Sequence, residues 1–164
     1  MKKLLPFYLL CAALAAAAYV LLSAHTEWTL FPYTKVLELL FGLHFTYSGT
    51  AYEAIGSAVV ITRSCSGLNL FLSTYAILVI GFLHRAKNRR LLPLLYFISA
   101  VAIAFIVTLA RIIVSLPFAE SPHFKLIHTV ISLCVFFGTG LLVYSLTQKI
   151  TDKMIGGHTR EKAV

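Results

Sequence analysis

The sequence predicts an all-α integral membrane protein with about four transmembrane helices and a small extracytoplasmic interfacial subdomain. Three observations support this prediction. The 164 residues are 59% hydrophobic, with a mean hydropathy of +0.87, which is too apolar for a soluble domain. Several apolar runs approach the roughly 20 residues needed to cross the hydrocarbon core. Lys and Arg are concentrated at the ends of these runs, as is typical of membrane topology signals.

The first expected span covers about residues 4–24. It follows Lys2 and Lys3 and contains many alanines, so it resembles a secretory signal peptide. The apolar core of a signal peptide is about 7–15 residues long, whereas this run continues for roughly 20. We therefore expect an uncleaved first transmembrane helix.

The segment 25–65 is the expected extracytoplasmic subdomain. Pro32 begins a stretch whose apolar residues have the spacing of a short amphipathic helix lying in the interface, with Lys35 and Glu38 toward water. Residues 58–62 are rich in β-branched side chains and predict a short strand. We expect this subdomain to lead into the second span.

The remaining chain completes one membrane domain, residues 1–150. Further spans are expected at about 66–83, 91–111 and 126–147, followed by a polar cytoplasmic tail at 151–164. Pro117 and Pro122 cannot continue a helix and predict a short loop before the fourth span.

The distribution of positive charge predicts the orientation. The N-terminus, the 84–90 loop and the C-terminal tail hold ten of the 14 Lys and Arg. By the positive-inside rule, both termini are therefore cytoplasmic. Cys65, Arg111 and His128 then all lie at the extracytoplasmic ends of spans, although they are far apart in sequence.

Several classes of function lack their sequence features. The net charge of +8 is scattered singly rather than forming a basic stripe, so we expect no nucleic-acid partner. The three cysteines show no zinc-ligand spacing, and we expect neither a disulfide framework nor a metal; Cys11 and Cys134 are expected to pack within spans. HExxH, P-loop and GxGxxG motifs are absent, so we expect no cofactor.

The chemically distinctive stretch surrounds Cys65, which lies beside Arg63, Ser66 and Gly67 where a polar segment enters an apolar run. A thiol at such a boundary, next to a cation, can ionise and attack a peptide carbonyl. Gly67 would let the substrate backbone approach closely. The alternative interpretation is an inert, buried loop cysteine.

Arg111 and His128 are the expected partners of this thiol. A charge that follows twenty apolar residues is costly unless it is paired or faces a polar cavity, and Arg111 is expected to stabilise the thiolate and then the oxyanion. His128 can take the thiol proton and return it to the leaving amine, with His123 as the fallback base. The structural alternatives are a snorkeling arginine and a hydrogen-bonded interface histidine.

Cys65-Ser66-Gly67 at the start of a span, Arg111-Ile112 at the outer end of the next and His128 at the start of a following one resemble the exosortase/archaeosortase family. The resemblance covers roughly residues 32–140 and is to a small form similar to exosortase K. It implies a cysteine protease or transpeptidase in the bacterial cytoplasmic (inner) membrane, with its site facing away from the cytoplasm. It further implies that exported proteins with a C-terminal sorting tail are cleaved through a Cys thioester and transferred to a surface anchor, whose acceptor nucleophile is unknown.

The chain also departs from larger members of that family. It has about four spans rather than around eight. Thr108 stands at the asparagine of an Asn-x-x-Arg pattern, and Ser132 stands where a glycine often follows the histidine. A function of another class is a non-catalytic membrane assembly or lipid-binding subunit, in which Arg111 and Lys125 hold the anionic headgroups of membrane lipid. Only the enzyme requires the thiol of Cys65.

Overall fold

The computed structural model describes residues 5–82 and 92–160, and the predicted basic loop at 84–90 lies outside them. Most of the described chain is helical. The elements are α1 (Leu5–Ala24), α2 (Thr26–Phe41), β1 (Phe45–Tyr47), β2 (Ala51–Ala54), β3 (Val60–Thr62), the 3-10 turn η1 (Arg63–Cys65), α3 (Leu68–Phe82), α4 (Leu92–Ser115), the 3-10 turn η2 (Leu116–Phe118) and α5 (Phe124–Arg160).

The predicted number of long apolar helices is found among the described residues. Within residues 5–82 and 92–160, four segments are long and apolar enough to cross a membrane: Leu5–Ala24, Arg63–Gly81, Pro93–Phe118 and Phe124–Lys149. Large apolar side chains on the outside of the bundle, such as Leu9, Leu95, Ile106 and Leu141, are more than half exposed. Because water penalises such a surface and lipid does not, the fold is compatible with a multi-pass membrane protein.

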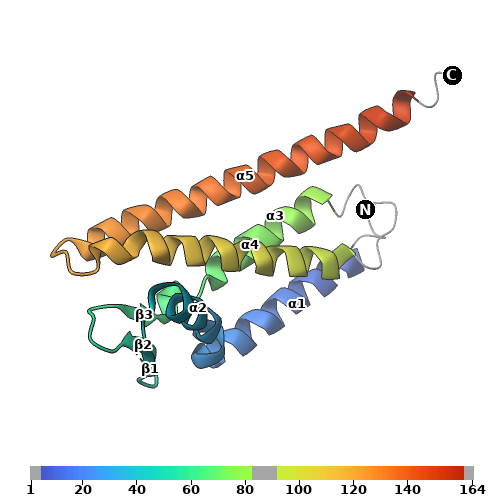
Figure 1. The fold of residues 1–164 in the computed structure, drawn as a ribbon. Helices are drawn as coiled ribbons and strands as arrows, with labels where there is room; N and C mark the ends of the chain where they lie inside the picture. The colour runs from blue at the N-terminus through green and yellow to red at the C-terminus, as the bar shows by residue number, and fades with distance from the viewer. Residues whose placement is uncertain (1–4, 83–91, 161–164) are drawn as a thin grey trace.

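Helix α3 lies in the middle of the bundle and contacts α1, α4 and α5 (Figure 1). One apolar core joins the four helices, with Cys11 from α1, Tyr75 from α3, Ala100 from α4 and Val143 from α5. At Gly81, a side chain would lie 2.7 Å from a methyl carbon of Thr147, so the glycine lets α3 and α5 approach closely.

Helix α2 begins earlier than the sequence predicts. It starts at Thr26, and Pro32 lies inside it rather than at its start. A proline removes only one backbone donor, and the hydroxyl of Thr29 adds bonds to the carbonyls of His25 and Thr26 in the first turn. The helix ends at Gly42, whose left-handed conformation lets its N–H bond the carbonyl of Glu38.

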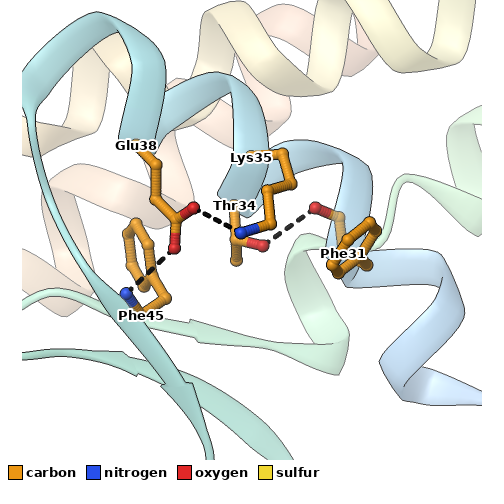
Figure 2. Close-up of polar contacts among 5 residues, drawn as sticks. All are labelled: Phe31, Thr34, Lys35, Glu38 and Phe45. Atoms are coloured by element: carbon orange, nitrogen blue, oxygen red, sulfur yellow. Dashed lines mark hydrogen bonds and ion pairs between the residues drawn. The ribbon is translucent and has the colours of Figure 1, made fainter.

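Glu38 ties α2 to the sheet, as Figure 2 shows. Its carboxylate accepts hydrogen bonds from Lys35 Nζ at 2.7 Å and from the backbone N–H of Phe45 at 3.2 Å. These two contacts, with Lys35 the larger cause, hold the pKa of Glu38 below its usual value. Lys35 is exposed, as predicted for the water-facing side of the helix.

The sheet has three antiparallel strands in the order β1-β2-β3. The expected strand at 58–62 is observed as β3. Short strands were expected in this subdomain, but no positions were predicted for β1 and β2. In the register Tyr52 is paired with both Tyr47 and Ile61. Tyr52 and Ile61 are buried in a second core together with Leu30 and Leu37 of α2.

Two helix ends differ from their expected positions. Helix α4 passes through Arg111 and continues to Ser115, because Arg favours helix and the next three residues are apolar. Pro117 then lies in η2. Helix α5 continues past the expected end of the fourth span through residues 151–160, which were predicted as a polar tail.

Candidate active site at the sheet end of the bundle

Cys65 lies in a tight turn between β3 and α3, at the end of the bundle where α2, the sheet and the α4–α5 connection gather (Figure 1). We call this end the sheet end. The backbone N–H of Ser66 bonds the carbonyl of Arg63 at 3.1 Å, and Gly67 then reverses the chain with a φ of 69° before α3 begins. The Cys65 side chain is buried. The turn therefore holds the thiol inside the protein rather than on its surface.

The structure around residue 67 leaves no room for a residue other than glycine. A side chain there would lie 2.3 Å from the Thr108 hydroxyl and 3.2 Å from the Tyr33 hydroxyl, and a positive φ is unfavourable for other residues. The structure thus gives Gly67 a role that the sequence did not reveal, which is the close approach of α4 and α2 to the Cys-Ser-Gly turn. The expectation that it also makes room for substrate stays a prediction.

Tyr33 and Thr108 support this turn and were not identified as site residues from the sequence. The Tyr33 hydroxyl donates a buried hydrogen bond of 3.2 Å to the carbonyl of Ser66. Burial raises the pKa of Tyr33, while a hydrogen bond from Thr108 and the charge of Arg111 oppose that rise. The phenol is therefore protonated at neutral pH and can donate. Thr108 precedes Arg111 by three residues and so shares its helix face, which is the signal that could have identified it.

Arg111 projects from α4 toward the Cys65 turn. Its Nη2 donates to the carbonyl of Ser64 at 3.2 Å, and its Nε is buried without a hydrogen-bond partner. Among residues 5–82 and 92–149 the structure shows one ion pair, between Lys35 and Glu38, and it leaves the charge of Arg111 unneutralised. An unpaired guanidinium at a cavity wall is suited to hold a developing negative charge.

His128, in the first turns of α5, is half-buried and contacts Ser115 of α4. The Ser115 hydroxyl donates to the carbonyl of Arg111 at 2.8 Å, and His128 Nδ1 lies 3.3 Å from the same hydroxyl oxygen. Because the serine proton is already used, Nδ1–H is the donor in the second contact. This arrangement leaves Nε2 as the free basic nitrogen.

Ser115 was also missed by the sequence argument. It lies four residues after Arg111, so it occupies the same face of α4. It is buried in a turn that is otherwise apolar, and a polar residue in such a turn needs a hydrogen-bond partner. That requirement is the signal that could have identified it.

Two cavities meet at His128. The larger, of about 790 Å³, is lined by Tyr19, Arg63, Ser64, Ser66, Gly67, Leu68, Asn69, Leu70, Thr108, Arg111, His128, Thr129, Ser132, Leu133, Val135 and Phe136. The smaller, of about 270 Å³, is lined by Ala58, Val59, Val60, Ile61, Cys65, Ile112, Ser115, Leu116, Ala119, Phe124 and His128. We call them the arginine cavity and the thiol cavity.

The structure thus brings Cys65, Arg111 and His128 to one pair of cavities from three elements. Arg63, Ser66 and Gly67, the predicted supporting residues, line the arginine cavity. Thr108 and Ser132, the positions that depart from the family pattern, line it as well.

The other candidates lie elsewhere. His123, the fallback base, and Lys125 are exposed and line neither cavity. Cys11 is buried in the core, as expected. Cys134 lies in the apolar segment Phe124–Lys149, as expected, but it is exposed on α5, so the expectation that it packs against other residues is wrong.

The arrangement combines a thiol, an imidazole with a defined free nitrogen and an unpaired guanidinium, which are the groups that acyl transfer through a thioester requires. These inferences come from the chain's own geometry. No model of a known protein family, no curated protein and no solved structure matches the chain.

Proposed function

We propose that the protein is a membrane cysteine protease or transpeptidase of the exosortase type, which cleaves a C-terminal sorting signal of exported proteins. The observation that supports this most strongly is the shared wall of the two cavities. Cys65 and His128 line the thiol cavity, and His128 and Arg111 line the arginine cavity. Nucleophile, base and cation therefore line two cavities that have His128 in common.

The proposed setting is the bacterial inner membrane, with both termini in the cytoplasm and the sheet end outside. The four apolar helices and the distribution of Lys and Arg support it. An exported substrate anchored by a hydrophobic C-terminal span would then present the residues before that span on the same side of the membrane as the site.

In the first step, His128 Nε2 accepts the Cys65 proton and the thiolate adds to the scissile carbonyl carbon. The guanidinium of Arg111 stabilises the resulting oxyanion, an interaction whose removal costs about 10²–10³ in rate in other enzymes. The C–N bond then breaks, and the imidazolium gives its proton to the leaving amine. The product is a thioester on Cys65 and a free C-terminal tail.

In the second step, water or the acceptor nucleophile enters beside His128. The imidazole takes its proton as it adds to the thioester carbonyl, and the C–S bond breaks. The thiolate recovers a proton from His128. Water gives hydrolysis, and an acceptor amine or hydroxyl gives transfer to a surface anchor.

A second candidate function is favoured by one feature of the arginine cavity. Its lining includes Arg63 and Arg111 as well as the apolar Leu133 and Phe136, and no acidic side chain is among its described lining residues. A non-catalytic protein that binds an anionic lipid would use the same features. It would have no use for Cys65.

The test uses a reporter that carries the C-terminal tail of an exported protein encoded beside this chain. Cys65→Ala should abolish reporter cleavage in cells, because no other thiol among the described residues lines a cavity. Cys134→Ala is the matched control, since it removes an exposed thiol outside the site. Thermal melts in detergent must show both variants folded. Cleavage by folded Cys65→Ala at the wild-type rate would contradict the enzyme and favour the lipid-binding candidate.

A further inference from the structure

The thiol cavity differs in character from the rest of the site. Its walls come from β3, the end of α4 and the start of α5, and among the described residues that line it none is charged. Its polar groups are Cys65, Ser115 and His128. The last two already bond each other, so the remaining surface is apolar, with Ile61, Ile112 and Phe124 among its walls.

The size of the thiol cavity limits what it can hold. An apolar cavity of about 150 Å³ binds a benzene ring, so about 270 Å³ accommodates one large aliphatic or aromatic side chain together with part of its backbone. A charged or amide side chain would lose its hydration there without gaining a partner. The cavity therefore selects an apolar group.

The position of the cavity determines which substrate group enters it. During thioester formation the acyl carbon becomes bonded to Cys65 Sγ, whereas the leaving amine must face His128 to receive its proton. Cys65 lines only the thiol cavity, while His128 borders both. The acyl half consequently stays on the thiol-cavity side, and the leaving half departs through the arginine cavity.

We infer that the thiol cavity is the specificity pocket for the side chain of the residue whose carbonyl is transferred to Cys65, and that this residue is large and apolar. The inference rests on the proposed function. Ala119 and Leu116 set the volume of the pocket from the α4–α5 connection. A substrate with Asp, Lys or Gly at this position is acylated slowly.

Reactive single-residue probes test the pocket without knowledge of the natural substrate. N-acetyl chloromethyl ketones of Phe, Leu, Ala, Asp and Lys alkylate a thiolate, forming an S–CH₂ bond and releasing chloride. The full chain in detergent carries Cys134→Ala, and peptide mass spectrometry follows modification of Cys65. The Phe and Leu probes should react at least about tenfold faster than the Ala probe, as expected for an apolar pocket that gains several methylene groups. The Asp and Lys probes should be slowest.

Variants that change the pocket volume in opposite directions sharpen the test. Ala119→Leu should lower the Phe-to-Ala rate ratio about tenfold, because it fills the cavity. Leu116→Ala enlarges the cavity and should raise the Phe-to-Leu ratio. Ala110→Leu is the matched control, since Ala110 is exposed on α4 and lines neither cavity; it should leave both ratios unchanged. Melts in detergent establish that each variant is folded.

Two unfavourable outcomes have different meanings. In the first outcome, Cys65 reacts and His128→Ala slows the reaction, but all probes react at the same rate, or Ala119→Leu and Leu116→Ala leave the rate ratios unchanged. The assignment of the specificity pocket is then wrong, and the proposed enzyme stands. In the second outcome, no probe modifies Cys65 faster in the folded protein than in denatured protein, and His128→Ala does not change the rate of modification. The proposed function is then wrong, and so is the assignment of the specificity pocket.

Discussion

Each chemical group of the candidate site is held by a residue from another element. Tyr33 of α2 holds the turn that carries Cys65, and Ser115 of α4 orients His128 of α5. The carbonyl of Ser64 holds the guanidinium of Arg111. Such supporting contacts fix a reactive geometry, which is why their loss can slow a reaction without unfolding the protein.

Replacing Ser115 tests the orientation of the imidazole. Ser115→Ala removes the acceptor of His128 Nδ1–H, so the ring loses its fixed tautomer, and kcat should fall about tenfold, as one hydrogen bond is worth. KM should change less than kcat, because the lost hydroxyl contacts His128 and the carbonyl of Arg111 rather than the substrate. Ser115→Thr keeps the hydroxyl and should recover most of kcat. Equal kcat in all three proteins would leave Ser115 with a packing role only.

Gly67→Ala tests the strained approach of α4 to the turn. The added carbon would meet the Thr108 hydroxyl, and the residue would keep a positive φ, so the free energy of unfolding should fall by about 1–3 kcal/mol. Gly138→Ala is the matched control, because Gly138 lies within α5 with open space around it. It should be neutral or stabilising by up to about 1 kcal/mol. Denaturation in mixed detergent measures both, and equal losses would show that the Gly67 contact is loose.

The sequence singled out three candidate site residues that the structure brings near each other, but not the residues that contact them. Cys65, Arg111 and His128 stand out because a polar group at the end of an apolar run is costly unless it is used. Tyr33, Thr108 and Ser115 have ordinary sequence surroundings, and their importance arises from contacts between elements far apart in the chain. The sequence suggested that Gly67 allows a substrate backbone to approach closely. The close contact within the protein that requires a glycine at this position is apparent only in the folded chain.

At the scale of elements, the short strands are the parts of the fold that sequence patterns predict least well. β3 follows a β-branched run, but β1 and β2 have only three and four residues. Strands this short are fixed by pairing and by contact with α2 rather than by their own preference. The start of α2 and the end of α4 also differ from their predicted positions, because Pro32 is tolerated within α2 and Arg111 within α4.

The link between α2 and β1 predicts an acid-sensitive part of the fold. Because the pKa of Glu38 is lowered in the folded protein, its stabilising effect is fully present above the ordinary pKa of glutamate and is lost as pH falls through the lowered value. The melting temperature of the wild type should therefore fall more steeply between pH 6 and pH 3 than that of Glu38→Gln.

Glu53→Gln is the control for this measurement, because Glu53 is exposed on β2 and its carboxylate forms no hydrogen bond or ion pair with the described residues. Its melting curve should follow that of the wild type at every pH. If the melting temperatures of wild type and Glu38→Gln depend on pH in the same way, the Glu38 contacts drawn in Figure 2 do not stabilise the subdomain.

At the scale of the whole molecule, the number and approximate limits of the apolar helices follow from hydropathy, because a membrane-spanning helix needs a minimum apolar length. Their arrangement does not follow, since the central position of α3 depends on which faces pack together. The two cavities are lined by residues that lie far apart in the sequence, including Cys65, Arg111 and His128, and no periodicity encodes how these residues meet.

Topology is tested by the accessibility of single cysteines in a cysteine-free background. A thiol at His123, near the α4–α5 connection, should react with a membrane-impermeant maleimide in intact spheroplasts, because the charge distribution places this end outside. A thiol at Lys149, at the other end of the same span, should react only after permeabilisation. The reverse pattern would place the site in the cytoplasm and exclude exported substrates.

If Cys65 carries an acyl group during cleavage, the mass of the protein recovered from cells that make the sorting reporter should show it. The wild type, or His128→Ala if deacylation is fast, should contain a species heavier by the acylated part of the reporter. Peptide mapping should place it on Cys65, and hydroxylamine should remove it, as it does other thioesters. Cys65→Ala should lack this species while remaining folded. Cleaved reporter without any hydroxylamine-sensitive adduct on Cys65, or cleavage by the folded alanine variant, would contradict the account.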